Sequence, residues 1–358
     1  MSGDGQAELG LYRVLSPEGE LVGEPDPGLS NETMRKMMRD MVVLRTFDQW
    51  MLKIHPLGKA SRYAPVEGQE ASVVGSVHSL SDVDWMFPTY RELTVGLLRG
   101  APLTTLMHRM FATSLDHMKG HEITLYGDRR YRIVVGAGAV SLMCPVAVGM
   151  AMAAKKRGEK EVFLVYLGDG ATSKGDFHEA VNWAGVFKPP VIFFVQNNQW
   201  AISVPFKMQT AAPNIAVKAK AYGIPGIRVD GNDVLAVYTV CRKFVERARA
   251  GEGAVLIEAV TYRMGPHTTA DDPSKYRSEE EVERMRAFDP LKRLRIYLTR
   301  NGLWSPEEEQ KIVESFKDEL RRATEEAEKT PPPSPRVIFE DIYATMPWHL
   351  LEEMAELG

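Results

Sequence analysis

The stretch from Glu161 to Tyr262 constrains the fold most, because short apolar runs alternate there with helix-like segments. The apolar runs read VFLVYL at 162–167, VIFFV at 191–195 and AVLIEAV at 254–260. Strands that are apolar on both faces are typical of a parallel sheet that helices cover on both sides. We therefore predict an α/β fold with a mostly parallel sheet and with ligands at the carboxyl ends of its strands.

Helical extensions are expected on both sides of this stretch. Residues 1–29 read as an extended arm rich in Gly, Pro and acidic residues, and residues 30–329 as one α/β domain in which 67–152 is mostly helical. Residues 330–358 begin with a Pro-rich hinge, TPPPSP, and continue as VIFEDIYATMPWHLLEE. Because that segment is too apolar for a solvated tail, we expect it to dock on another surface.

A long helix is predicted to begin at Ser30 or Asn31, either of which can cap it. Its apolar side chains recur at helical spacing: Met34, Met37, Met41, Leu44, Phe47 and Met51. Such a stripe is typical of a core or of a subunit interface. This helix and the MPWHLLEE segment are candidates for contacts with a partner, because both would expose apolar faces that one domain does not cover; the alternative for each is packing within the chain itself.

Charge and composition exclude several functions. A net charge of -4 and no basic tract give no reason to expect nucleic acid as a partner. No window reaches the roughly 18 to 20 apolar residues of a membrane-spanning helix, so we expect a soluble cytoplasmic protein with no membrane partner. The two cysteines, Cys144 and Cys241, lack metal-site spacing and are expected to be buried thiols.

The first apolar run continues into LGDGATSKGD at 167–176. A nucleoside-triphosphate loop would need Lys and Ser or Thr where Asp176 and Phe177 stand. A dinucleotide fingerprint would need a third glycine where Ser173 stands. What remains is an acid, Asp169, between two glycines at the end of a buried strand.

A second polar end follows the next apolar run, which continues into Gln196, Asn197 and Asn198. The 26 residues between Gly170 and Asn197 suit one crossover helix and one strand. If the two strands are neighbours, the oxygens of Asp169 and Asn198 meet and can hold a Mg²⁺ ion that also binds a diphosphate. Each motif alone is a common turn or loop, but their combination at two strand ends favours a site.

These motifs resemble the thiamine diphosphate motif, and their surroundings resemble one family. The chain is similar to the alpha subunit of the thiamine diphosphate-dependent first component of 2-oxo acid dehydrogenase complexes, of the pyruvate and branched-chain types. The matching segments are GQEA at 68–71, WMFPTYRE at 85–92, GDGATSKGDFHEAVNWA, FFVQNNQWAIS, IRVDGNDVLAVY at 227–238 and EAVTYRMGPHTTADDPSKYRS at 258–278, together with the terminal DIYATMPWHL.

The resemblance implies a role for each matching residue. Magnesium would be bound by Asp169, by Asn198 and by the carbonyl of Trp200, and His267 would be the catalytic residue near the thiazolium ring. The cofactor would be bound by Tyr90, Arg91, Val140, Gly168, Gly170, Ala171, Asn198 and His267. The loop that carries His267 would be ordered by Arg263, Asp271, Tyr276 and Arg277.

The chain departs from the family between Gly120 and Met143. Leu142 and Met143 stand where some relatives have polar ligands for a monovalent ion. Gln196 stands where some relatives have a basic residue, which removes one candidate phosphate contact. Thr268 falls at a position that is phosphorylated in some members of the family.

The resemblance also implies an activity and partners. The chain would be half of an enzyme, completed by a beta subunit in a heterotetramer of two alpha and two beta chains. The enzyme would decarboxylate pyruvate or a branched-chain 2-oxo acid and pass the acyl group to a lipoyl-bearing acyltransferase. The alternatives are an acetoin-type dehydrogenase alpha subunit and a non-catalytic paralogue that binds a partner.

Overall fold

The computed structural model describes residues 10–26, 28–121 and 125–357. Within them lies a six-stranded, all-parallel sheet in the order β1-β7-β8-β4-β3-β2. Its strands are β1 (Leu11–Tyr12), β2 (Trp85–Phe87), β3 (Phe163–Gly168), β4 (Val191–Asn197), β7 (Gly226–Asp230) and β8 (Val255–Val260). Beside this sheet, β5 (Trp200–Ala201) and β6 (Val204–Pro205) form a small antiparallel hairpin.

Successive side chains of the central strands enter two separate cores, one on each face of the sheet. In β3, Leu164 and Tyr166 belong to the larger core, whereas Phe163, Val165 and Leu167 belong to the smaller one. This alternation is the period-two geometry of a strand. It explains why residues 163–167 of β3 and 191–195 of β4 are all apolar, as the sequence predicted.

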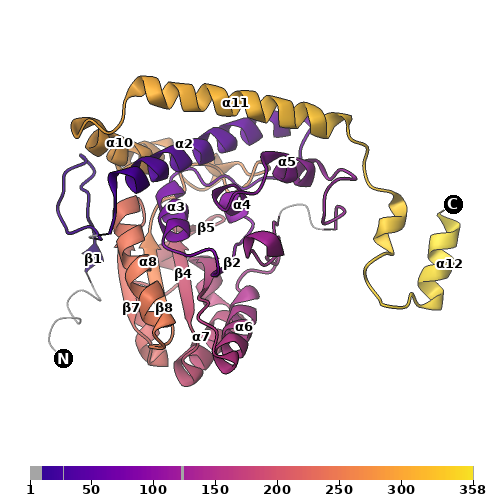
Figure 1. The fold of residues 1–358 in the computed structure, drawn as a ribbon, viewed down its shortest axis with the longest axis horizontal. Helices are drawn as coiled ribbons and strands as arrows, with labels where there is room; N and C mark the ends of the chain where they lie inside the picture. Colours follow the sequence, from indigo (N-terminus) through magenta and orange to yellow (C-terminus); the bar gives the residue numbers. More distant parts are fainter. Residues whose placement is uncertain (1–9, 27, 122–124, 358) are drawn as a thin grey trace.

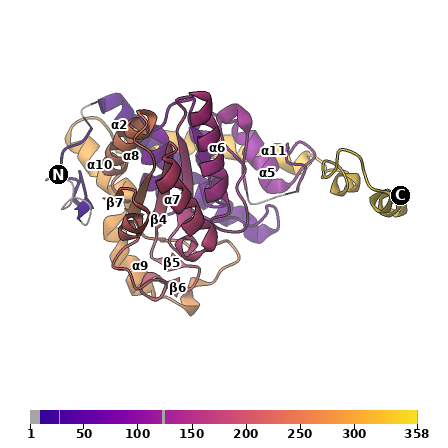
Figure 2. The ribbon, with the colours of Figure 1, turned by 90° about the horizontal axis from the view of Figure 1, so that it is seen from below.

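Helices cover both faces, and Figures 1 and 2 show the two layers. The larger core packs the sheet against α3 (Glu70–His78) and α8 (Val234–Arg249), with α2 (Asn31–Ile54), α5 (Leu103–Phe111), α10 (Pro290–Arg300) and α11 (Pro306–Lys329) beyond them. The smaller core packs it against α6 (Met143–Arg157), α7 (Gly175–Phe187) and the 3₁₀ helix η6 (Ala216–Tyr222). The predicted α/β architecture is thus confirmed.

Shorter helices lie between these elements. They are α4 (Val95–Leu98), α9 (Glu279–Met285) and α12 (Trp348–Glu356), with the 3₁₀ helices η1 (His55–Leu57), η2 (Glu92–Thr94), η3 (Arg129–Tyr131), η4 (Gly170–Ser173), η5 (Phe206–Met208), η7 (Pro273–Lys275), η8 (Arg286–Phe288) and η9 (Pro335–Ile338).

The methionine-rich helix is a core element. Ser30 caps α2 by accepting a hydrogen bond from the Thr33 amide. The side chains of its apolar stripe are all at most 7% exposed: Met34, Met37, Met41, Leu44, Phe47 and Met51. The expectation that this helix exposes an apolar face to a partner is therefore wrong, because α3, α10 and α11 of the same chain cover it.

Both edge strands come from segments where no strand was expected. β2 interrupts the region that was predicted to be mostly helical, and β1 belongs to the amino-terminal arm. The arm is fixed further by Asp233, whose Oδ2 accepts hydrogen bonds from the amides of Val14 at 2.7 Å and Leu15 at 2.6 Å. Residues 1–9 and 27 of the predicted arm lie outside the described residues.

The carboxyl-terminal segment leaves the body of the molecule after α11, as Figures 1 and 2 both show. Phe339 is buried and Lys119 pairs with Asp341, which ties the first part of the segment to the body. The final helix, α12, has no buried residue.

Two further expectations concern burial and membranes. Cys144 and Cys241 are buried as predicted, and burial raises the pKa of Cys144 to about 12. Among the described residues, no helix combines the length and the apolar character that crossing a bilayer requires.

Candidate cofactor-binding site

A cavity of about 240 Å³ opens at the carboxyl ends of β3 and β4. These strands are direct neighbours, and Gly168 is in register with Gln196. Asp169 and Asn198 therefore reach the same place, as the spacing predicted. The structure brings ten of the predicted site residues to the cavity wall: Tyr90, Arg91, Val140, Gly168, Asp169, Gly170, Ala171, Asn198, Trp200 and His267.

Asp169 is a buried carboxylate with no cation partner among the described residues. It is 2% exposed, and its Oδ2 accepts a hydrogen bond of 2.6 Å from Nε2 of Gln209. Burial raises its pKa above the ordinary value, and the hydrogen bonds and the more remote positive charge of Arg263 oppose this shift. Because a buried negative charge is costly unless it is paired, this position suits a bound cation.

The other two predicted metal ligands are neutral oxygens close by. Oδ1 of Asn198 accepts a hydrogen bond of 3.2 Å from the Trp200 amide. The Trp200 carbonyl accepts one of 3.2 Å from Nη1 of Arg263, which leaves a second lone pair for another partner. In the described part of the chain, no three His, Cys, Asp or Glu side chains form a group that could hold a metal ion by themselves. A metal here would therefore rely on Asp169 and neutral oxygens, a set that suits Mg²⁺.

The two glycines of the loop have different roles. A Cβ built on Gly168 would meet no atom within 4 Å, whereas one on Gly170 would lie 2.6 Å from Cβ of Ala201. Since Gly168 also lines the cavity, its missing side chain leaves room for a ligand. Gly170 instead lets the β5–β6 hairpin pack closely on η4.

Arg91 and Tyr90 form the wall opposite this loop. Arg91 is 5% exposed, and its Nη1 donates to the Pro65 carbonyl at 2.6 Å. Its Nη2 lies 3.2 Å from Nδ1 of His267. The ring of Tyr90 meets His267 edge to face, with centroids 5.7 Å apart.

The protonation of His267 follows from its neighbours. Burial, with the positive charges of Arg91 and Arg263, lowers its pKa to about 4. The imidazole is therefore neutral near pH 7. Because both arginines can only donate, Nδ1 is the acceptor and Nε2 carries the hydrogen.

The four predicted loop-ordering residues lie behind His267 and outside the cavity lining. Oδ2 of Asp271 accepts hydrogen bonds from the His267 amide, at 2.8 Å, and from the Tyr276 hydroxyl. Nη2 of Arg263 donates to that same hydroxyl at 2.7 Å. Nη2 of Arg277 donates to the carbonyls of Met264 at 2.9 Å and Gly265 at 2.6 Å. Together these contacts fix residues 263–277 in one conformation.

Five polar residues in the cavity wall had no role assigned from the sequence: Gln69, Thr89, Glu92, Ser141 and Gln196. Glu92 accepts hydrogen bonds from Nε2 of Gln196 and from the amide and hydroxyl of Thr89. GQEA and TYRE had matched the family, but as motifs without a role for Gln69 or Glu92. In the sequence, only a position beside Arg91 or within a matching motif could have indicated that a residue of this group lines the site.

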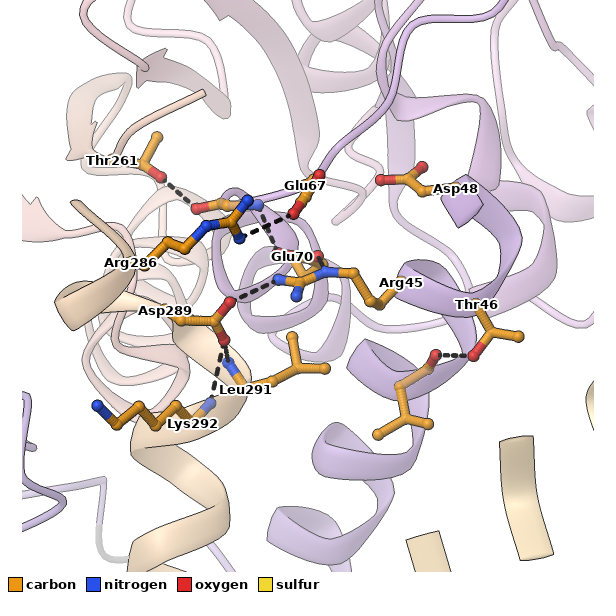
Figure 3. A network of polar contacts seen from close by, with 12 residues as sticks. Arg45, Thr46, Asp48, Glu67, Glu70, Thr261, Arg286, Asp289, Leu291 and Lys292 are labelled. Carbon is orange, nitrogen blue, oxygen red and sulfur yellow. Dashed lines mark hydrogen bonds and ion pairs between the residues drawn. The ribbon is translucent and has the colours of Figure 1, made fainter. Parts of the chain in front are cut away.

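The segment that carries Gln69 is held by a charged network, shown in Figure 3. Arg45 pairs with Glu70 and, at 3.0 Å, with Asp289. Arg286 pairs with Glu67 on the other side at 3.4 Å. The network thus clamps residues 67–70 between α2 and the start of α10.

A second cavity of about 190 Å³ adjoins the first and shares Tyr90 and His267 with it. Its other lining residues are Arg62, Tyr63, Ala64, Leu93, Met110, Gly138 and Thr268. The cavity is thus mostly apolar with one cationic residue. It lies next to the histidine whose neutral form the site favours.

Comparison with known proteins defines the class. The model of the dehydrogenase E1 component family matches residues 38–336. The chain therefore belongs to the dehydrogenase E1 component family, which confirms the resemblance and implies thiamine diphosphate as the cofactor.

Individual relatives have similar lengths. The chain is 47% identical over 325 residues to a 3-methyl-2-oxobutanoate dehydrogenase subunit alpha of Mycobacterium tuberculosis, which covers 89% of this chain and 86% of the relative. It is 40% identical over 349 residues to a pyruvate dehydrogenase E1 component subunit alpha of Bacillus subtilis, and the match covers 97% of this chain and 91% of that relative. A Staphylococcus aureus subunit with the same name is 39% identical over 353 residues, and the match covers 98% of this chain and 93% of that relative. These names do not favour the acetoin-type or the non-catalytic alternative.

Proposed function

We propose that this chain is the alpha subunit of a thiamine diphosphate-dependent 2-oxo acid dehydrogenase that acts on pyruvate or a branched-chain 2-oxo acid. The observation that carries the proposal is the cavity at the ends of β3 and β4, where Asp169, Asn198 and His267 meet. The alpha-subunit relatives support a beta subunit as partner. We further propose two alpha and two beta chains, a lipoyl-bearing acyltransferase as acceptor, and the cytoplasm as the location.

Mg²⁺ would be held by Asp169, by Asn198 and by the carbonyl of Trp200. Asp169 would supply the negative charge, and the two neutral oxygens would be the other protein ligands, a set that Mg²⁺ favours. Arg91 supplies a buried positive charge for the diphosphate. Tyr90 would contact the same group, Gly168 would let the backbone approach it, and Gly170 and Ala171 line the same wall.

When bound, thiamine diphosphate supplies an electron sink for loss of carbon dioxide from the oxo acid. Val140 would support its rings with an apolar contact. Nε2 of His267 would donate its hydrogen to an oxygen of the substrate, since Nδ1 already faces two arginines. Arg263, Asp271, Tyr276 and Arg277 would keep His267 in that orientation.

The oxo acid would enter through the second cavity, which shares Tyr90 and His267 with the first. The apolar side chains there suit the alkyl group of the substrate, and Arg62 suits its carboxylate. Pyruvate and branched-chain acids differ by a few methyl or methylene groups, each worth about 1–3 kcal/mol in such a pocket. Activity should therefore be measured with both kinds of substrate.

Asp169→Asn tests the metal-dependent part of the proposal. In a complex with the beta subunit, we expect the variant to lower the affinity for Mg²⁺ and thiamine diphosphate about tenfold or more, because the charged ligand is lost. Isothermal titration calorimetry measures both affinities. Unchanged affinities would show that Asp169 does not bind the metal.

A further inference from the structure

Gln69 lines the cavity but is neither one of the proposed metal ligands nor one of the proposed cofactor-binding residues. It is the residue before α3, it is 0% exposed, and it lines the cavity beside Asn198. The Thr261 hydroxyl donates to the carbonyl of Gly68 at 2.8 Å, and the ion pairs in Figure 3 hold Glu67 and Glu70. The backbone on both sides of Gln69 is therefore fixed.

Neighbouring groups set the orientation of the Gln69 amide. The Trp200 amide is a donor, so the atom of Asn198 that faces it is the oxygen. The Asn198 nitrogen then donates to Oε1 of Gln69 at 3.0 Å. Nε2 of Gln69 is consequently left as a buried donor without a partner among the described residues.

An unpaired donor in this position indicates the kind of ligand that would satisfy it. An N–H group cannot bind a cation, and buried donors without a partner are rare because they are costly. The neighbouring Asn198 is a proposed ligand of Mg²⁺, and the anion that shares this metal brings acceptor oxygens to the same wall.

We infer that Gln69 is a cofactor-binding residue: Nε2 donates to a diphosphate oxygen while Oε1 orients Asn198. This inference rests on the proposed function, because it takes the diphosphate as the ligand of the cavity. It assigns a purpose to GQEA, the matching motif that had none. The side-chain amide of Gln69 would then contact both Asn198 and the diphosphate.

The test uses the complex of this chain with its beta subunit and two variants, Gln69→Met and Gln69→Glu. Met keeps the shape of Gln and removes both hydrogen bonds, whereas Glu keeps the oxygen that faces Asn198 and adds a negative charge. Gln199→Met is the matched control, since the side-chain amide of Gln199 donates to Asn197 at 3.0 Å and makes no hydrogen bond with the side chain of Asp169 or Asn198 among the described residues. Calorimetry measures binding of thiamine diphosphate and of inorganic diphosphate at saturating Mg²⁺, and thermal unfolding checks the fold.

We expect Gln69→Met to weaken binding of both ligands by about 10- to 100-fold, the range for a hydrogen bond to a charged group. Gln69→Glu should weaken both further, and Gln199→Met should change neither. If saturating Mg²⁺ restores full affinity to Gln69→Met, the residue acts only through Asn198 and the direct contact is refuted. Should that variant fail to fold, Gln69→Glu decides, because unchanged binding in it would also refute the contact.

The same titrations separate this inference from the proposed function. An unmutated complex that binds inorganic diphosphate but not thiamine diphosphate would overturn the proposed function and leave the anion contact of Gln69 in place. An unmutated complex that binds neither ligand would overturn both.

Discussion

The polar side chains in the cavity have hydrogen-bond directions that their neighbours impose. His267 faces Arg91 and Arg263 through Nδ1, and Gln69 faces Asn198 through Oε1. In each case the partner can only donate to the atom that it meets. Both side chains consequently keep one nitrogen with its hydrogen for another partner, Nε2 of His267 and Nε2 of Gln69.

The charge state of this single residue, His267, gives a testable prediction. A base whose pKa is lowered to about 4 takes up a proton only as the pH falls toward that value, so His267 stays neutral around pH 6 to 7. In the cofactor-free complex, deuterium exchange at the ring C2 position, read by mass spectrometry, should give a midpoint near 4. Arg91→Met should raise that midpoint, since it removes a positive neighbour.

A midpoint near 6.5 for His267 in the unmutated complex would contradict this account of the site. An unchanged midpoint in Arg91→Met would contradict it as well, because the positive charge of Arg91 would then not act on the ring.

Two elements, η4 and the β5–β6 hairpin, meet at Gly170, and their contact yields a second prediction. Gly170→Ala places a Cβ 2.6 Å from that of Ala201. Such overpacking should cost about 1–3 kcal/mol of stability and weaken cofactor binding. Gly168→Ala meets no neighbouring atom, so it should leave the unfolding midpoint unchanged and weaken cofactor binding alone.

Thermal unfolding and titration with thiamine diphosphate measure these two effects separately. Gly149→Ala is the control, because Gly149 is exposed on α6 and its Cβ would also meet no atom. The control should keep full cofactor affinity and gain slightly in stability. Equal losses of stability in Gly168→Ala and Gly170→Ala would contradict the different roles of the two glycines.

The sequence predicted long, uniformly apolar elements well and short ones poorly. β3 and β4 are apolar on both faces, so their burial was readable, and their polar ends indicated where Asp169 and Asn198 meet. β1 and β2 have two and three residues, too few to show a period, and they form strands because the sheet offers an edge. The methionine stripe of α2 fits a core as well as an interface, and only the packing of α3, α10 and α11 decides between them.

At the scale of the molecule, the carboxyl-terminal segment leaves an apolar surface uncovered. Trp348 is 71% exposed, and Ile342, Tyr343 and Leu351 are exposed too. Because α12 and the chain just before it stand away from the body, we propose that residues 330–358 dock on the beta subunit. Its burial there would explain apolar side chains that nothing in the described part of this chain covers.

Trp348→Glu with Leu351→Glu tests this docking. No residue of α12 is buried, so the double variant should fold normally. It should weaken association with the beta subunit by about 30-fold or more, the effect of losing an interface hot spot. Sedimentation of the co-produced chains measures the association, with Glu353→Lys on the same helix as the control. Normal assembly of the double variant would refute the docking of this segment.

We propose that this chain, joined to a beta subunit, decarboxylates a 2-oxo acid. The measurement that tests it most directly is carbon dioxide release by the co-produced complex from pyruvate and from 3-methyl-2-oxobutanoate, with and without thiamine diphosphate and Mg²⁺. The account predicts release from at least one acid only when both are present, and its loss in Asp169→Asn. A complex that binds the cofactor yet releases carbon dioxide from neither acid would contradict it.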